Sequence, residues 1–277
     1  MSSSTSRESY DAAARWLGEF AAPAEPSAIE EMAEGILAFA GLLRGQPRLR
    51  RTLVDSGRSP EDRVRLLRSL LEGRLGAQTL ELLAMLVAAR WSSPSELLDA
   101  AERLGVEGLL ASAQRIGDLA EVEDELFRFG KIVAGDPQLA AVLSDSTALT
   151  SAGEDRRVRL VHDLLEGKAR PVTLRLGSLA LAAPGGRGFE AALTWLVERA
   201  AARREHEVAY VTVAAQLDPE EESRLASALA ARYGHDISLK ITVDSRVIGG
   251  VRVKVGSDLY DATVQRRLTE ARSAMTK

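Results

Sequence analysis

The sequence predicts a mainly α-helical protein that ends in a small α+β domain, and three observations carry this prediction. Apolar residues recur with a helical period from about Ser6 to Arg204. Two blocks of this helical part recur about 90 residues later. After Arg204 the apolar residues alternate, as they do in strands. We therefore expect two tandem six-helix bundles, residues 1–105 and 106–204, followed by a β-α-β-β-α unit over residues 205–277.

Short motifs that begin with serine mark the starts of several helices. In "SPED" (59–62) and "SPSE" (93–96) the serine hydroxyl can accept a backbone N–H, and the acid favours the positive end of the helix. The proline between them suits the first helical position, where no donor is needed. "SAGE" (151–154) has the same order without the proline. Each motif therefore predicts a helix that begins at its serine.

The helical part contains an internal duplication. "RVRLLRSLLEG" (63–73) returns as "RVRLVHDLLEG" (157–167) with eight of eleven residues identical. "GQPRLRRTLVDS" (45–56) returns as "GDPQLAAVLSDS" (135–146) with six of twelve. Chance similarity explains scattered matches but not two ordered blocks. The spacing of 90 to 94 residues exceeds the ~20–50 residues of solenoid units, so it predicts a duplicated helical domain.

The C-terminal part alternates apolar and polar residues in three places. "VAYVTVAA" (208–215) predicts a first strand. "ISLKITVD" (237–244) and "VIGGVRVKVG" (247–256) predict two more, which we expect to pair as a hairpin across "DSR" with one face in solvent. Because glycine weakens a strand, Gly249 and Gly250 predict a bend there.

Two helices complete the predicted C-terminal unit. Asp218 and Pro219 open a helix that continues to about Tyr233. We expect Asp261 to cap a last helix. The apolar stripe of that helix consists of Val264, Leu268, Ala271 and Met275.

Composition excludes several classes of protein. The 36 Lys and Arg residues are balanced by 40 Asp and Glu, which predicts no general attraction to nucleic acid or anionic lipid. The absence of cysteine excludes disulfides, thiolate metal sites and a cysteine nucleophile. Uncharged stretches such as residues 176–186 are much shorter than the ~18 residues that a membrane-spanning helix needs. We therefore expect any membrane association to depend on partners.

No motif predicts chemistry. None of His162, His206 and His235 has a partner at the spacing of a zinc motif such as H-E-x-x-H. "PGGRG" (184–188) lacks the Lys-Ser/Thr of a phosphate-binding loop, so we expect a turn between two helices. The sequence predicts no catalytic residue, no cofactor and no metal, and Trp16, Trp91 and Trp195 are expected to serve as packing or interface anchors.

The segment "VDSRVIGGVRVKVGSDLYDATVQRRL" (243–268) resembles the C-terminal signature of the delta subunits of bacterial rotary ATP synthases, called the oligomycin-sensitivity-conferring protein in mitochondria. The matching residues are Val243, Asp244, Ile248, Gly249, Gly250, Gly256, Asp261, Thr263, Val264, Arg267 and Leu268. Residues 117–145 are similar to the second and third helices of the family's six-helix domain, and "YDAAARWL" (10–17) to its first. The second helical copy is similar to the long delta subunits of actinobacteria.

The resemblance implies a non-catalytic stator subunit. In this family the helical domain binds the N-terminal helices of alpha subunits on the catalytic head, and the C-terminal region joins the b subunits of the peripheral stalk. The resemblance therefore implies these partners, no nucleic acid, and a peripheral location on the cytoplasmic face of the cell membrane. A joint of this kind resists the torque of the rotor during ATP synthesis.

The family's groove for an alpha-subunit helix lies between its first and fifth helices. Carried onto the first copy, the groove candidates are Tyr10, Ala14, Leu17, Leu83, Val87 and Trp91. In the second copy they are Leu110, Ile116, Leu176 and Leu179. Each of these residues can equally belong to the core of a helical bundle. The duplication leaves open which copy has the family's contacts.

A helical adaptor that binds RNA or a signalling protein is the alternative function. An RNA adaptor would need a basic face, whereas residues 205–277 contain ten Lys and Arg against eleven Asp and Glu. We therefore expect no binding when the protein is titrated with RNA or DNA at several salt concentrations. Affinity that falls steeply with salt would instead favour the adaptor.

Overall fold

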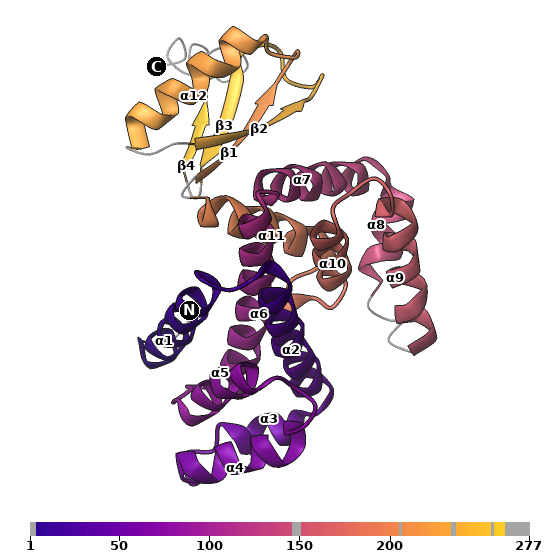
Figure 1. The fold of residues 1–277 in the computed structure, drawn as a ribbon. Helices are drawn as coiled ribbons and strands as arrows, with labels where there is room; N and C mark the ends of the chain where they lie inside the picture. Colours follow the sequence, from indigo (N-terminus) through magenta and orange to yellow (C-terminus); the bar gives the residue numbers. More distant parts are fainter. Residues whose placement is uncertain (1–3, 146–150, 205–206, 234–236, 256–257, 264–277) are drawn as a thin grey trace, which may run out of the picture. The chain divides into compact units, whose positions relative to one another are not determined.

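A computed structural model of the chain describes residues 4–145, 151–204, 207–233, 237–255 and 258–263. It divides into two compact units, Met1–Leu196 and Val197–Lys277, which are described separately. The first unit is helical, and the second carries a small sheet (Figure 1). The predicted fold class, mainly α with a small α+β part at the C-terminus, is confirmed.

Eleven α-helices and one short 3-10 turn precede the sheet in the described residues (Figure 1). They are α1 (Ser4–Ala21), α2 (Pro26–Gly45), α3 (Pro47–Leu53), α4 (Pro60–Leu71), α5 (Ala77–Ala88), α6 (Pro94–Ile116), α7 (Leu119–Gly135), α8 (Pro137–Ser144), α9 (Ser151–Leu165), α10 (Pro171–Ala180), η1 (Pro184–Gly186) and α11 (Phe189–Arg203).

The predicted helix starts are confirmed. The Ser59 hydroxyl accepts the backbone N–H of Asp62 at 3.1 Å at the start of α4. Ser93 does the same for Glu96 at 3.3 Å at the start of α6. α9 begins at Ser151, the first residue of the third motif. Capping satisfies backbone donors that would otherwise lack a partner, so these short motifs fix where the helices begin.

α2 packs closely on α6 in the helical unit. A Cβ atom added to Gly108 of α6 would lie 2.8 Å from the Cβ atom of Ala33 on α2, and one added to Gly105 would lie 2.5 Å from the side chain of Leu37. At one end of the contact, the Ser112 hydroxyl of α6 donates to the carbonyl of Pro26, the first residue of α2, at 3.1 Å. Glycine at these positions therefore allows the two backbones to approach.

The helix α6 is buried along most of its length and crosses the domain boundary expected between residues 105 and 106. A cut at that boundary would divide a continuous helix between two fragments. The division into separate domains at 1–105, 106–204 and 205–277 therefore stays a prediction, as does the pair of independent six-helix bundles.

Both copies of the repeat bury an arginine that binds the end of a helix. Arg63 Nη1 donates to the carbonyl of Leu53, the last residue of α3, at 3.4 Å. Ninety-four residues later, Arg157 Nη1 donates to the carbonyl of Leu143 in α8 at 3.5 Å. Carbonyl groups at the C-terminal end of a helix lack intrahelical partners and carry partial negative charge, so a guanidinium stabilises them. The repeated sequence thus folds into a repeated interaction.

Glycine and phenylalanine also keep their roles in both copies. Gly73 and Gly167 both adopt a positive φ, +78° and +68°, where the chain turns after α4 and α9. Phe39 and Phe129 are both buried, in α2 and α7. Only glycine adopts the left-handed region without cost, which explains why the turn residue is retained.

The second unit contains a four-stranded mixed sheet in the order β2-β1-β3-β4. β1 (Glu207–Val213) pairs in parallel with β2 (Ile237–Val243) and antiparallel with β3 (Val251–Val255), which pairs antiparallel with β4 (Asp258–Asp261). α12 (Pro219–Tyr233) connects β1 to β2 (Figure 1). Its buried Leu229 belongs to the same apolar cluster as the strand residues. The predicted start and end of this helix are confirmed.

The hairpin expected between the second and third strands is wrong, because β1 lies between β2 and β3. Alternation shows which residues share a face but not which strands are neighbours. The β1-α12-β2 crossover makes β1 and β2 parallel neighbours, and seven residues (244–250) then carry the chain past β1 to its other edge.

One further expectation for the sheet is corrected, and one additional strand is present. Lys240 alternates with the apolar residues of β2 and was therefore expected in solvent, but it is only 4% exposed. Its neighbour in register on β1 is Tyr210, and the aliphatic stem of a lysine can pack against apolar surface. Residues 258–261, for which no strand was predicted, pair with β3 as β4, and Asp261 is the last residue of that strand. The expectation that Asp261 caps a helix stays a prediction. The expected last helix, including Val264, Leu268, Ala271 and Met275, lies outside the described residues.

Gly249 and Gly250 lie in the turn before β3 and not inside the strand. Both have a positive φ, +75° and +83°. A Cβ atom at Gly250 would lie 2.5 Å from the carbonyl oxygen of Ala262 and 2.9 Å from the Cα atom of Thr263. The expected bend is confirmed, and its cause is both the backbone conformation and the close approach of the segment after β4.

We predict that Gly108→Ala lowers the stability of the helical unit, by ~1–2 kcal/mol, because overpacking against Ala33 costs more than the ~1 kcal/mol that alanine gains in a helix. Gly41→Ala in α2 is the matched control. It has open space around it and should raise stability by ~0.5–1 kcal/mol. Urea unfolding followed by circular dichroism measures both. Equal effects at the two positions would contradict the close packing of α2 on α6.

We predict that Gly250→Ala destabilises the C-terminal unit more than Gly73→Ala destabilises the helical unit. Both glycines have nearly the same φ, so both substitutions incur ~1–2 kcal/mol from the left-handed conformation. Only Gly250 has a backbone within contact distance of the new Cβ atom, because nothing lies within 4 Å at Gly73. Thermal unfolding of each variant against the parent protein measures the difference. Equal losses of stability in the two variants would show that the positive φ, and not the close contact with Ala262 and Thr263, is the reason for glycine at position 250.

Candidate functional site

Among the residues that the structure describes, no group of three or more His, Cys, Asp or Glu side chains is arranged to hold a metal ion. No described helix is both long enough and apolar enough to cross a bilayer. The candidate site is therefore sought among grooves on the helical unit.

All six groove candidates of the first copy belong to one apolar cluster, which draws residues from α1 to α6. Leu17, Leu83 and Val87 are buried in it, so they support the groove from below. The partly exposed members are Tyr10, Ala14 and Trp91. Only these three could touch a partner without rearrangement of the cluster.

Tyr10 and Trp91 lie toward α6. The guanidinium carbon of Arg103 on α6 lies 3.9 Å from the centre of the Tyr10 ring, and the Trp91 indole N–H donates to the carbonyl of Leu86 at 2.7 Å. Both residues line a polar hollow of about 290 Å³ together with Glu96 and Asp99. This side of α1 is already joined to α6 by a hydrogen bond from the Ser6 hydroxyl to the Glu96 carboxylate at 2.5 Å.

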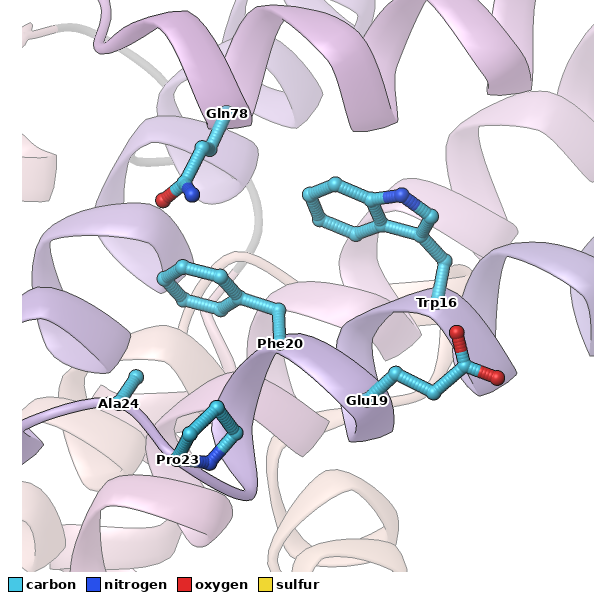
Figure 2. Close-up of a pocket in the computed structure, with 6 residues that line it drawn as sticks. All are labelled: Trp16, Glu19, Phe20, Pro23, Ala24 and Gln78. Atoms are coloured by element: carbon cyan, nitrogen blue, oxygen red, sulfur yellow. The ribbon is translucent and has the colours of Figure 1, made fainter.

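A larger and more apolar hollow of about 490 Å³ lies between the C-terminal part of α1 and the start of α5 (Figure 2). Trp16 and Phe20, one helical turn apart on α1, stack with 5.9 Å between ring centres and 7° between planes. Figure 2 shows both rings directed toward the helix that carries Gln78. Glu19, Pro23 and Ala24 complete the lining. Two half-exposed aromatic rings over a hollow of this kind form a typical anchor site for a helix.

The predicted groove did not include Phe20, Glu19 or Gln78. Trp16 was predicted to be a packing or interface anchor, but it was not assigned to the groove. The sequence does contain a clue, since an aromatic pair spaced i, i+4 on an amphipathic helix forms one patch. The clue is ambiguous because such a pair is equally suited to a core. Only the packed structure shows that these two rings stay partly exposed.

Three of the four residues predicted for the groove of the second copy are buried. Leu110, Leu176 and Leu179 are buried in α6 and α10, two helices that pack on each other. Ile116, at the C-terminal end of α6, differs from these three residues because it is 54% exposed. These candidates therefore supply core packing rather than one continuous exposed stripe.

The segment 184–188 forms the expected turn between two helices, and a buried carboxylate holds it. Glu102 of α6, 2% exposed, accepts the backbone N–H of Gly185 at 2.6 Å and pairs with Arg44 of α2 at 2.6 Å. A phosphate at this turn would meet the Glu102 carboxylate, and like charges repel. The turn thus joins α6 to the segment before α11.

The described signature residues hold the turns of the C-terminal unit. Asp244 accepts hydrogen bonds from the guanidinium and from the backbone N–H of Arg246, and these bonds lower the pKa of the Asp244 carboxyl to about 2. Asp261 accepts the hydroxyl and the backbone N–H of Thr263, at 2.6 and 3.1 Å, and these bonds lower its pKa. Ile248 is exposed. Gly256, Val264, Arg267 and Leu268 lie outside the described residues.

Comparison with known proteins agrees with the resemblance seen in the signature. The family model described as "ATP synthase delta (OSCP) subunit" matches residues 106–275. The chain is 55% identical to the ATP synthase subunit delta of Salinispora arenicola and 56% identical to that of Salinispora tropica, over 100% of both chains in each case. A chain of the Toxoplasma gondii mitochondrial ATP synthase hexamer matches 62% of this chain and 95% of its own length, at 18% identity. Its TM-score of 0.36 is too low to establish a shared fold.

The family match covers the second helical copy and the C-terminal unit, and the relatives cover the whole chain. Together with the signature turns, these matches decide the family. The chain belongs to the ATP synthase delta (OSCP) subunit family, a family of non-catalytic subunits.

Proposed function

We propose that this protein is the stator joint that connects the catalytic head of ATP synthase to its peripheral stalk. Its helical unit binds the N-terminal helix of an alpha subunit, and its C-terminal unit joins the b subunits. The complex holds it at the cytoplasmic face of the cell membrane. Its role is mechanical: it prevents the head from turning with the rotor while ATP is made.

One observation carries this proposal, namely the hollow with stacked Trp16 and Phe20 between α1 and α5. These are the helices between which the family resemblance expects the alpha-subunit helix. The hollow is apolar at its base and carries Glu19 and Gln78 at its rim, which suits an amphipathic helix with its apolar face inward. Trp16 and Phe20 pack against the same buried apolar cluster as Leu17, Leu83 and Val87, and this cluster gives the rings a rigid support.

A joint of this kind needs tight binding without chemistry. Aromatic anchors bury large areas at low conformational cost, so a few of them can dominate the binding energy. The separate C-terminal unit, with its own apolar core, provides a second attachment that does not depend on the first.

We predict that Trp16→Ala weakens binding of a synthetic alpha-subunit N-terminal helix to the full chain by at least ~30-fold, because truncation of an aromatic anchor costs ~2 kcal/mol or more. Calorimetry measures the affinity. The full chain is used because a cut at residue 105 would divide α6.

Ile132→Ala is the control, since Ile132 is an exposed apolar residue on α7 and should leave the affinity unchanged. Thermal unfolding of both variants checks that the helical unit stays folded. An unchanged affinity in a folded Trp16→Ala protein would exclude the α1–α5 groove as the binding site.

A further inference from the structure

The repeated order of helices gives the chain two grooves of the same kind. α5 and α10 occupy equivalent places, since each follows the repeated α4 or α9 and each buries a threonine at the same repeat position, Thr79 and Thr173. α1 precedes the first set of helices as α6 precedes the second. The groove between α1 and α5 therefore has a counterpart between α6 and α10.

The chain's own α2 contacts both walls of the counterpart groove. On the α6 side, Ala33 of α2 packs against Gly108 so closely that no Cβ atom fits between them. On the α10 side, Glu34 of α2 binds Arg175 through two parallel hydrogen bonds of 2.5 and 2.7 Å. Adjacent residues of one helix thus contact both walls of the groove. A bidentate pair of this type fixes geometry as well as charge.

The equivalent surface of the first copy is open and carries the opposite charge. The repeat offset of 94 residues places Glu81 of α5 where α10 has Arg175, and Gln78 where α10 has Val172. Val172 is buried, whereas Gln78 and Glu81 are exposed, one turn apart. Gln78 lines the hollow of Trp16 and Phe20, and Glu19 is the only charged residue in that lining.

We propose that α2 occupies the second groove from within, which leaves the α1–α5 groove as the single site for a partner helix, and that Glu81 selects a helix with a basic residue at that point. The inference rests on the proposed function for the identity of the partner. The charge expected of the partner helix follows from how α2 contacts the second groove. α2 presents Glu34 to Arg175, so a helix seated in the same manner on the first copy must present Lys or Arg to Glu81. The acidic Glu19 on the same rim favours the same charge.

The first arm of the test examines α2 and needs no partner. Glu34→Arg and Arg175→Glu each place like charges together, so each should lower the unfolding temperature by ~2–4 °C. The double exchange Glu34→Arg with Arg175→Glu restores opposite charges and should recover at least half of the loss. Additive losses in the double variant would overturn the placement of α2 in this groove.

The second arm counts sites by calorimetry, with the full chain and a synthetic peptide of the alpha-subunit N-terminal helix. We expect one peptide per chain and an affinity about 10-fold lower for Glu81→Lys. Asp163→Lys on α9, an exposed position with the same change of charge, is the control and should not alter the affinity. Two peptides per chain would overturn the single site, and an affinity insensitive to Glu81→Lys would overturn the charge selection.

The two arms separate this inference from the proposed function. Absence of any peptide binding would contradict the alpha-subunit helix as the partner. The Glu34–Arg175 exchange would then still decide whether α2 fills the second groove.

Discussion

The helical unit depends on how closely α2 approaches α6. Gly105 and Gly108 remove the side chains that would hold the helices apart, and Ala33 and Leu37 fill the space that results. Protein interiors are packed at crystal density, so a contact at this distance leaves no freedom to slide. Since α6 also contacts α1, α5, α7 and α10, the position of this one helix sets the position of both copies of the repeat.

Buried charges hold the remaining helix ends in place. Arg63 and Arg157 bind carbonyls at the ends of the preceding helices, and Glu102 binds the turn before α11 while it pairs with Arg44. Each buried charge has a partner at hydrogen-bond distance, which offsets the cost of removing it from water. These groups fix the geometry of the helix ends.

The proposed binding surface follows from the difference between the two copies. In one, a helix of the same chain covers the groove, and charged Arg175 has an internal partner. In the other, Trp16 and Phe20 stay partly exposed above a rigid apolar base. A stator joint needs a site that exists before the partner arrives, because preorganised aromatic anchors lose little entropy on binding. Duplication of a helical domain thus gave a longer protein in which the two equivalent grooves differ in what covers them.

The sequence by itself determined the helix starts, the duplication, the family and the α+β character of the C-terminal unit, because caps, repeats and periodicity are local patterns. Tertiary structure alone decided the strand order, since alternation at β2 and β3 does not reveal that β1 separates them. It also decided that Leu83 and Val87 lie beneath the surface while Phe20 lies on it. An apolar residue on an amphipathic helix has the same pattern in a core and in a groove, and only the neighbouring helices distinguish the two.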